Sequence, residues 1–201
     1  MPDASPTRNI TIACTGASGA VFTREILRQL ETDNRIGTVN LAISDGGMRV
    51  LAEELQIKGR SGLVQQLLQV DSRKIKLLEN EDIGACIASG SYPTDAMIVI
   101  PCSMGTLARI ANGMAINLIE RAADVCLKEQ RPLVLCVRET PLNKVHIRNM
   151  QLAADAGAVI YPIAPTFYDA PCDSSEMARQ FVMRVLAFLK LDQPGMYRWK
   201  Y

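Results

Sequence analysis

The sequence contains one histidine, His146, among its 201 residues. Zinc sites that need two or more histidines are therefore excluded within this chain, and no C-x-x-C spacing is present to replace them. A Ser-His-Asp triad would depend on His146, yet the G-x-S-x-G turn of many serine hydrolases is absent. We expect His146 to be structural, and the chemistry to rest on carboxylates, lysine, arginine or a bound cofactor.

Strong net charge and long apolar runs are also lacking. The formal net charge is +1 at pH 7, which offers no bulk attraction for nucleic acid. No apolar stretch approaches the ~20 residues of a membrane span, and the opening "MPDASPTRN" lacks the basic and then apolar pattern of a signal peptide. We therefore expect neither nucleic acid nor a membrane as a partner, and a cytoplasmic location.

Short apolar runs alternate with amphipathic segments along the whole chain. Strands are expected at 10–14, 39–43, 96–100, 133–137 and 158–161, and helices at 18–31, 48–55, 103–111, 115–129, 142–156 and 177–189. Residues 58–92 show no clear period. The alternation predicts one α/β domain spanning residues 1–201, with a doubly wound, mostly parallel sheet between two layers of helices.

Four segments are expected at the carboxyl ends of the strands, where ligands bind in such sheets: 15–19, 44–46, 101–106 and 138–141. The first, "TGASG", lacks the three spaced glycines of a dinucleotide-binding turn. It could be only a tight connection with Ser18 as the helix N-cap, or it could leave backbone N–H groups free to bind an anion. Two such small-residue turns together with Ser44 favour a ligand that carries a phosphate group.

Basic residues are concentrated between positions 121 and 138. Arg121 and Lys128 lie seven residues apart and so share one helix face. That face could equally be solvated, with both side chains paired to Asp124. Arg138, followed by Glu139, comes directly after a predicted strand, so its place at the ligand-binding edge follows from the strand itself.

Five motifs in order carry a family resemblance: "TGASGA", "PCSMGTLARIANG", "RAADVCLKEQRPLVLCVRETPL", "HIRNMQLAADAGAVIYPIAPTFYDAP" and "MYRWK". Together, from Ile10 to Trp199, they resemble the UbiX family of flavin prenyltransferases. The resemblance implies a Rossmann-like or flavodoxin-like three-layer fold and a dodecamer. It also implies a metal-independent reaction, in which a dimethylallyl group from dimethylallyl phosphate joins N5 and C6 of reduced FMN. The prenylated FMN would pass to a UbiD-type decarboxylase.

The resemblance further implies a role for particular positions of this chain. The residues implied to bind FMN are Gly16, Ala17, Ser18, Ser44, Ser103, Met104, Gly105, Thr106 and Arg138. Those implied to hold dimethylallyl phosphate are Arg121, Lys128, Arg138, Tyr168, Arg184 and Trp199. Those implied in catalysis are Ser18, Glu54, Lys128, Arg138 and Glu139. The cations would stabilise charge on the departing phosphate, and Glu54 or that phosphate would take the proton lost from C6.

We also expect a particular conformation at each end of the chain. Residues 1–8 are expected to be disordered or extended. Residues 190–201 are expected to form a tail over an active site, which in a dodecamer can belong to a neighbouring subunit.

Two stretches depart from the family pattern. Val21-Phe22-Thr23 stands where an aromatic residue followed by glycine is usual, and Asn143-Lys144-Val145 stands where His-Leu-Gly is frequent. One alternative is a flavin-dependent cysteine decarboxylase of the same fold. The loop at 101–106 and the late position of His146 disfavour it. A second alternative is a non-catalytic FMN-binding subunit of a decarboxylase.

Overall fold

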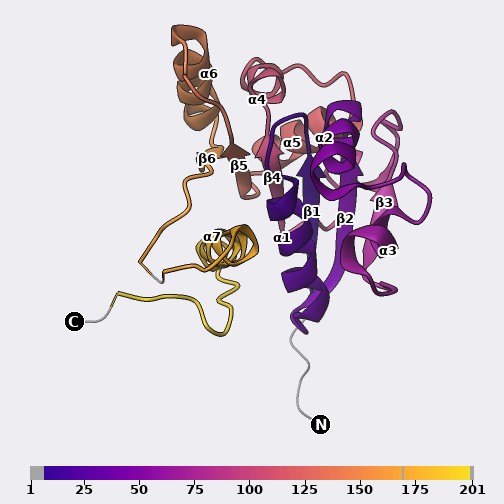
Figure 1. Ribbon diagram of the computed structural model, residues 1–201. Helices are drawn as coiled ribbons and strands as arrows, with labels where there is room; N and C mark the ends of the chain where they lie inside the picture. The colour runs from indigo at the N-terminus through magenta and orange to yellow at the C-terminus, as the bar shows by residue number, and fades with distance from the viewer. Residues whose placement is uncertain (1–6, 169, 200–201) are drawn as a thin grey trace.

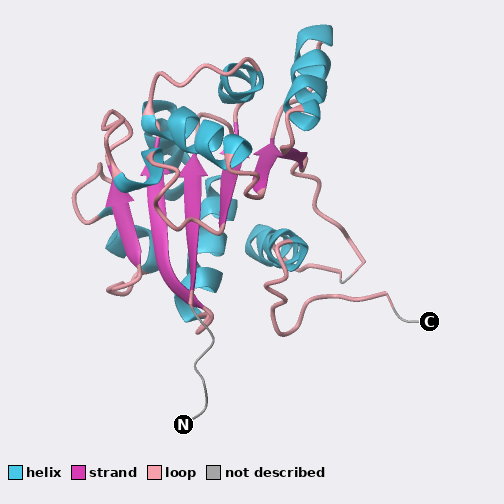
Figure 2. Cartoon of the chain, turned by 180° about the vertical axis from the view of Figure 1, so that it is seen from behind, coloured by secondary structure: helices cyan, strands magenta, loops and turns pink. Residues whose placement is uncertain are grey.

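A six-stranded parallel sheet forms the centre of the protein. The computed structural model describes residues 7–168 and 170–199, so most of the expectation for residues 1–8 lies outside the described residues. The strands are β1 (Arg8–Cys14), β2 (Ile36–Ile43), β3 (Ile75–Leu78), β4 (Ala96–Cys102), β5 (Leu133–Val137) and β6 (Val159–Ile160), in the order β3-β2-β1-β4-β5-β6. Every neighbouring pair is parallel, so all the arrowheads in Figure 2 lie at one edge. The order reverses between β1 and β4, as in Rossmann-type sheets.

Helices cover both faces of this sheet (Figure 1). One face packs against α1 (Ala20–Thr32), α2 (Asp45–Leu55), α3 (Leu63–Leu68) and α7 (Ser174–Phe188). The other packs against α4 (Met104–Ala111), α5 (Leu118–Lys128) and α6 (Lys144–Asp155). Successive residues of a strand serve opposite faces, so Ile12 joins the first core and Ala13 the second. The predicted three-layer α/β fold is confirmed.

The predicted elements agree with the structure except in the segment 58–92. The strand expected at 133–137 has the same bounds in the structure, and the other predicted elements differ by a few residues at their ends. The unassigned segment contains α3, the edge strand β3 and a 3₁₀ helix, η1 (Cys86–Ala88). These elements have six, four and three residues, too few for a period to be visible in the sequence. None of the helices within the described residues is both long and apolar enough to cross a bilayer.

The C-terminal segment is tied back to the turn between α1 and β2. The Gln193 side-chain amide donates a hydrogen bond to Asp33 Oδ2 (2.9 Å), and Arg35 Nη2 donates to the Asp192 carbonyl (3.0 Å). Arg35 Nη2 also pairs with the carboxylate of Asp33 at 2.6 Å. This anchor lies at the amino edge of the sheet, where β2 begins, and it determines where residues 194–199 start.

We expect the stabilisation by this anchor to be lost at acidic pH. Hydrogen bonds, chiefly from Arg35, lower the pKa of Asp33 from 3.8 to about 2 in the folded protein. The carboxylate therefore stabilises the fold above pH ~4, and this contribution is lost as the pH falls toward 2. Asp33→Asn is expected to lower the thermal midpoint at pH 7 by about 4 °C, a gap that narrows as the pH falls from 4 to 2. Thermal unfolding of the unchanged protein and of Asp33→Asn across this pH range measures the difference between their midpoints. A difference that stays constant with pH would contradict the prediction.

Candidate active site

Three strand-to-helix turns meet at the carboxyl edge of the sheet. Thr15, after β1, donates its hydroxyl to the Pro101 carbonyl (3.0 Å) and accepts a hydrogen bond from the Ser103 backbone N–H (2.8 Å). The turn after β2 approaches so closely that a Cβ on Gly16 would lie 3.1 Å from the Cα of Gly46. Glycine at these two positions therefore lets the turns after β1 and β2 touch, and Thr15 joins the first turn to α4.

The buried Thr15 hydroxyl gives a direct test of this connection. Thr15→Val preserves the shape of the side chain but leaves the Ser103 N–H without its acceptor, which costs about 1–3 kcal/mol. We expect the thermal midpoint to fall by about 5 °C. Thr15→Ser keeps the hydroxyl, so its thermal midpoint is expected to fall by much less. Equal midpoints for the valine and serine variants would show that this hydroxyl does not hold the turns together.

A cavity of about 310 Å³ opens between these turns. It is lined by Thr15, Gly16, Ser44, Asp45, Gly46, Asn80, Ser103, Thr106, Arg109, Asn117 and Ile119. Ser44 caps α2 by accepting from the Gly47 N–H (3.1 Å), and Ser103 caps α4 by accepting from the Thr106 N–H (3.3 Å). The N-termini of two helices thus face one cavity, an arrangement that favours an anion.

Four residues implied by the resemblance to bind FMN line this cavity, namely Gly16, Ser44, Ser103 and Thr106. Asn80 and Arg109 line it as well, and neither is among the residues expected from the sequence pattern. Asn80 lies in the segment that showed no period, and Arg109 resembles an ordinary surface residue in the last turn of α4. A signal for Arg109 was present in Glu120, a charged residue among the apolar positions of α5, because a buried carboxylate requires a partner.

The third helix N-terminus, that of α1, is occupied by Glu54. This residue lies on α2, and its carboxylate accepts from the N–H groups of Gly19 (3.0 Å) and Ala20 (2.7 Å). Ser18, one possible N-cap in the sequence, is not the cap: Gly19 holds that position with φ 127° and has no side-chain cap. Ser18 is instead exposed beside this helix end. Glu54 thus performs the capping that the local sequence does not supply.

Arg138 and Glu139 follow β5 at the same edge of the sheet. The Arg138 backbone N–H donates to the Cys102 carbonyl (3.3 Å) at the end of β4, and both charged side chains are exposed. Glu139 Oε1 accepts from the Thr140 N–H (2.9 Å). Their backbone is therefore held in place while the guanidinium of Arg138 stays accessible to a ligand.

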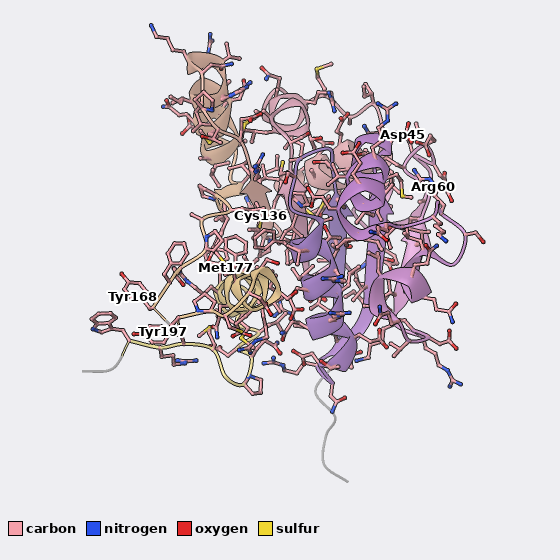
Figure 3. The ribbon with its side chains drawn as sticks, in the orientation of Figure 1. Asp45, Arg60, Cys136, Tyr168, Met177 and Tyr197 are labelled. Carbon is pink, nitrogen blue, oxygen red and sulfur yellow. The ribbon has the colours of Figure 1, made fainter. Side chains whose placement is uncertain are left out.

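Tyr168, Arg184 and Trp199 lie together around a second cavity, of about 220 Å³. Tyr168 stacks on Tyr197 with ring centroids 5.9 Å apart, and Trp199 meets it edge-on at 5.5 Å. Figure 3 shows Tyr168, on the loop between β6 and α7, close to Tyr197 of the C-terminal segment, and both lie across the molecule from Asp45 at the first cavity. The structure brings together three residues implied to hold dimethylallyl phosphate, but within one chain it keeps them apart from the turns around the first cavity.

Lys128 lies at the amino edge of the sheet, opposite the carboxyl edge where the first cavity opens. Helix α5 begins beside the first cavity, at Asn117, and its eleven residues extend about 16 Å to Lys128, just before β5 begins. Lys128 pairs with Glu129, whereas Arg121 pairs with Asp124 at 2.7 Å. The suggested Arg121–Asp124 pair is present, and that of Lys128 with Asp124 is not. One subunit therefore does not bring Lys128 to Arg138.

His146 has a structural role in the capping box of α6. Its backbone N–H donates to the Asn143 side chain (2.8 Å), and its Nδ1 accepts from the Asn143 N–H (3.4 Å). Within the part of the chain that the structure describes, no three His, Cys, Asp or Glu side chains gather as metal ligands would.

Comparison with known proteins places this geometry in a family. The family model described as "Flavoprotein" matches residues 2–189. A flavin prenyltransferase UbiX of Salmonella typhimurium is 40% identical, over 96% of this chain and 98% of its own. The structure of AnUbiX (PadA1) in complex with FMN and dimethylallyl pyrophosphate superposes with a TM-score of 0.85 at 36% identity, covering 97% of this chain and 98% of that chain.

A dodecameric FMN-dependent UbiX-like decarboxylase from Escherichia coli O157:H7 is similar to the same degree, with a TM-score of 0.85 and 36% identity. The match covers 96% of this chain and 100% of that one. Sequence and fold agree over nearly the full length of each chain, and the small-residue turns and the first four of the five motifs lie within the residues matched by the family model. This chain belongs to the UbiX family of flavin prenyltransferases.

Proposed function

We propose that this protein binds reduced FMN and attaches to its N5 and C6 atoms a dimethylallyl group taken from dimethylallyl phosphate. The observation that carries the proposal is the first cavity, where the N-termini of α2 and α4 converge beside Gly16, Ser44 and Ser103. Backbone N–H groups at helix N-termini suit a phosphate, and the small residues leave room for it. The cavity fits the phosphate end of FMN, with Ala17 and Ser18 on the adjoining turn after β1 and Met104 and Gly105 at the start of α4.

Reduced FMN supplies the nucleophilic N5 and C6 atoms, and the residues of this chain supply charge and position. Arg138 at the end of β5 and Arg184 beside Tyr168 would hold the phosphate of the donor. Breaking the allylic C–O bond leaves negative charge on that phosphate, which these guanidinium groups stabilise. Arg121 and Lys128 complete the proposed phosphate-binding set, Glu139 is proposed to act in catalysis, and Trp199 would cover the site.

The site is proposed to be shared between subunits of a dodecamer. Within one chain, neither Lys128 nor the group formed by Tyr168, Arg184 and Trp199 lies at the first cavity. Neighbouring copies would have to supply them. Large apolar side chains are exposed at Val145 and Ile147 on α6 and at Phe167, and their burial would favour contacts between copies. The product, prenylated FMN, would pass to a UbiD-type decarboxylase.

The test is anaerobic incubation of the purified protein with reduced FMN and dimethylallyl phosphate, followed by mass spectrometry of the flavin. We expect the flavin to gain the mass of one dimethylallyl group, and its spectrum after oxidation to differ from that of FMN. A parallel incubation with dimethylallyl diphosphate separates the two donors. Bound FMN of unchanged mass with either donor would contradict the proposal and leave a non-catalytic FMN-binding subunit.

A further inference from the structure

Glu120 is a buried carboxylate that directs one arginine side chain. It lies on α5 with a side chain only 1% exposed, and its Oε1 accepts a hydrogen bond from Arg109 Nε. Its other oxygen accepts from the Ile116 N–H (3.1 Å). A carboxylate so far from water is strongly destabilising unless a cation pairs with it. The Glu120 carboxylate therefore holds the guanidinium of Arg109 in one place.

That place is the wall of the first cavity. Arg109 lines the cavity, and its Nη1 lies 3.6 Å from where a Cβ on Gly105 would stand, beside the N-terminal turn of α4. Nε is used by Glu120, but within residues 7–168 and 170–199 no side-chain or backbone acceptor is hydrogen-bonded to the two terminal amino groups. They remain available as donors next to the N–H groups of α4.

Neither Asp45, which lines the cavity, nor Arg60, which pairs with Asp45 but does not line the cavity, replaces Arg109. Arg60 donates to the Ile43 carbonyl (3.1 Å) and lies 3.5 Å from Asp45 and 3.6 Å from Glu79. Asp45 lines the cavity with a carboxylate that is largely exposed to solvent. Among the described residues that line the cavity, Arg109 is thus the one cationic side chain.

We propose that Arg109, positioned by Glu120, binds the phosphate group of FMN and sets the preference of the site for FMN over riboflavin. The inference rests on the proposed function because it takes FMN as the ligand. A guanidinium can donate two parallel hydrogen bonds to a phosphate, and such charge-assisted bonds are about twice as strong as neutral ones. Riboflavin has the same ring and ribityl chain without the phosphate, so Arg109 gives it no comparable bond.

The experiment measures dissociation constants for FMN and for riboflavin, by quenching of flavin fluorescence, in five proteins. They are the unchanged protein, Arg109→Met, Arg109→Lys, the double variant Arg109→Met/Glu120→Gln, and the control Arg35→Met. The double variant avoids leaving a buried carboxylate unpaired, so it keeps the test valid if Arg109→Met alone does not fold. Arg35 is a matched control because it also pairs with a nearly buried carboxylate, Asp33, but at the opposite edge of the sheet.

We expect Arg109→Met and the double variant to weaken FMN binding about tenfold or more and to leave riboflavin binding unchanged. Arg109→Lys keeps the charge and should retain part of the preference, and Arg35→Met should retain all of it. If Arg109→Met and the double variant bind FMN and riboflavin with the same ratio of dissociation constants as the unchanged protein, the inference is overturned, whether or not both flavins bind more weakly. FMN binding by the unchanged protein would still support the proposed site. An unchanged protein that binds neither flavin would overturn the proposed function, and this inference with it.

Discussion

Arg138→Ala is expected to lower the rate of the proposed dimethylallyl transfer by about a hundredfold or more, because a guanidinium that stabilises the departing phosphate contributes a few kcal/mol to the transition state. The side chain is exposed and only its backbone is hydrogen-bonded to β4, so the fold is expected to survive. Lys128→Ala is expected to cause a similar loss from the other edge of the sheet. Single-turnover rates with reduced FMN and dimethylallyl phosphate measure both effects.

The two variants are expected to complement each other when they are mixed in one oligomer. Because α5 keeps Lys128 about 16 Å along its axis from the carboxyl edge, the proposed site takes Lys128 from one subunit and Arg138 from another. Co-expression of the two chains in equal amounts would then produce intact pairs at up to about a quarter of the sites in a symmetric assembly. Activity well above that of either variant alone is the expected result.

The control is a third chain that carries both substitutions, co-expressed with Arg138→Ala, since no pairing of these two chains contains both intact residues. Lys76→Ala, at an exposed position of β3, checks that loss of a surface lysine alone has no effect. If mixed oligomers of the two single variants stay inactive while each variant keeps its oligomeric state, the shared site is wrong. A fully active monomer in light scattering would refute it as well.

Glu54→Gln is expected to separate the chemical role of this residue from its structural one. Glutamine retains a side-chain oxygen that can accept from the N–H groups of Gly19 and Ala20, so α1 stays capped. It has no negative charge and cannot serve as a base. The variant should bind both ligands, and its flavin should gain the dimethylallyl group, but ring closure at C6 should be slowed by about a hundredfold.

Mass alone does not report ring closure, so the readout is the absorbance spectrum after oxidation. Glu54→Ala provides the comparison: it loses the cap as well, and its thermal midpoint is expected to drop by an amount equivalent to about 1 kcal/mol, whereas that of Glu54→Gln stays near the original. Ring-closed product formed by Glu54→Gln at the original rate would remove Glu54 from the chemistry. The phosphate released from the donor would then be the base.

The sequence by itself determined the fold class and the edge of the sheet where a ligand would bind. The apolar run at 133–137 is short, continuous and bounded by Pro132 and Arg138, so both its conformation and the position of Arg138 after it follow from local pattern. Ser44 and Ser103 likewise stand at helix starts and cap them. These features depend on a few neighbouring residues, and local conformation is what a sequence pattern encodes.

Only the tertiary structure decided which distant residues meet. Glu54 reaches the start of α1 from α2, thirty-four residues along the chain from Ala20, and takes the capping place that the local pattern offered to Ser18. Glu120 reaches back from α5 to orient Arg109. Lys128 lies at the far edge because α5 returns from one end of the sheet to the other. Such contacts depend on how the helices cross the sheet and pack on it, and no spacing within a single segment records that arrangement.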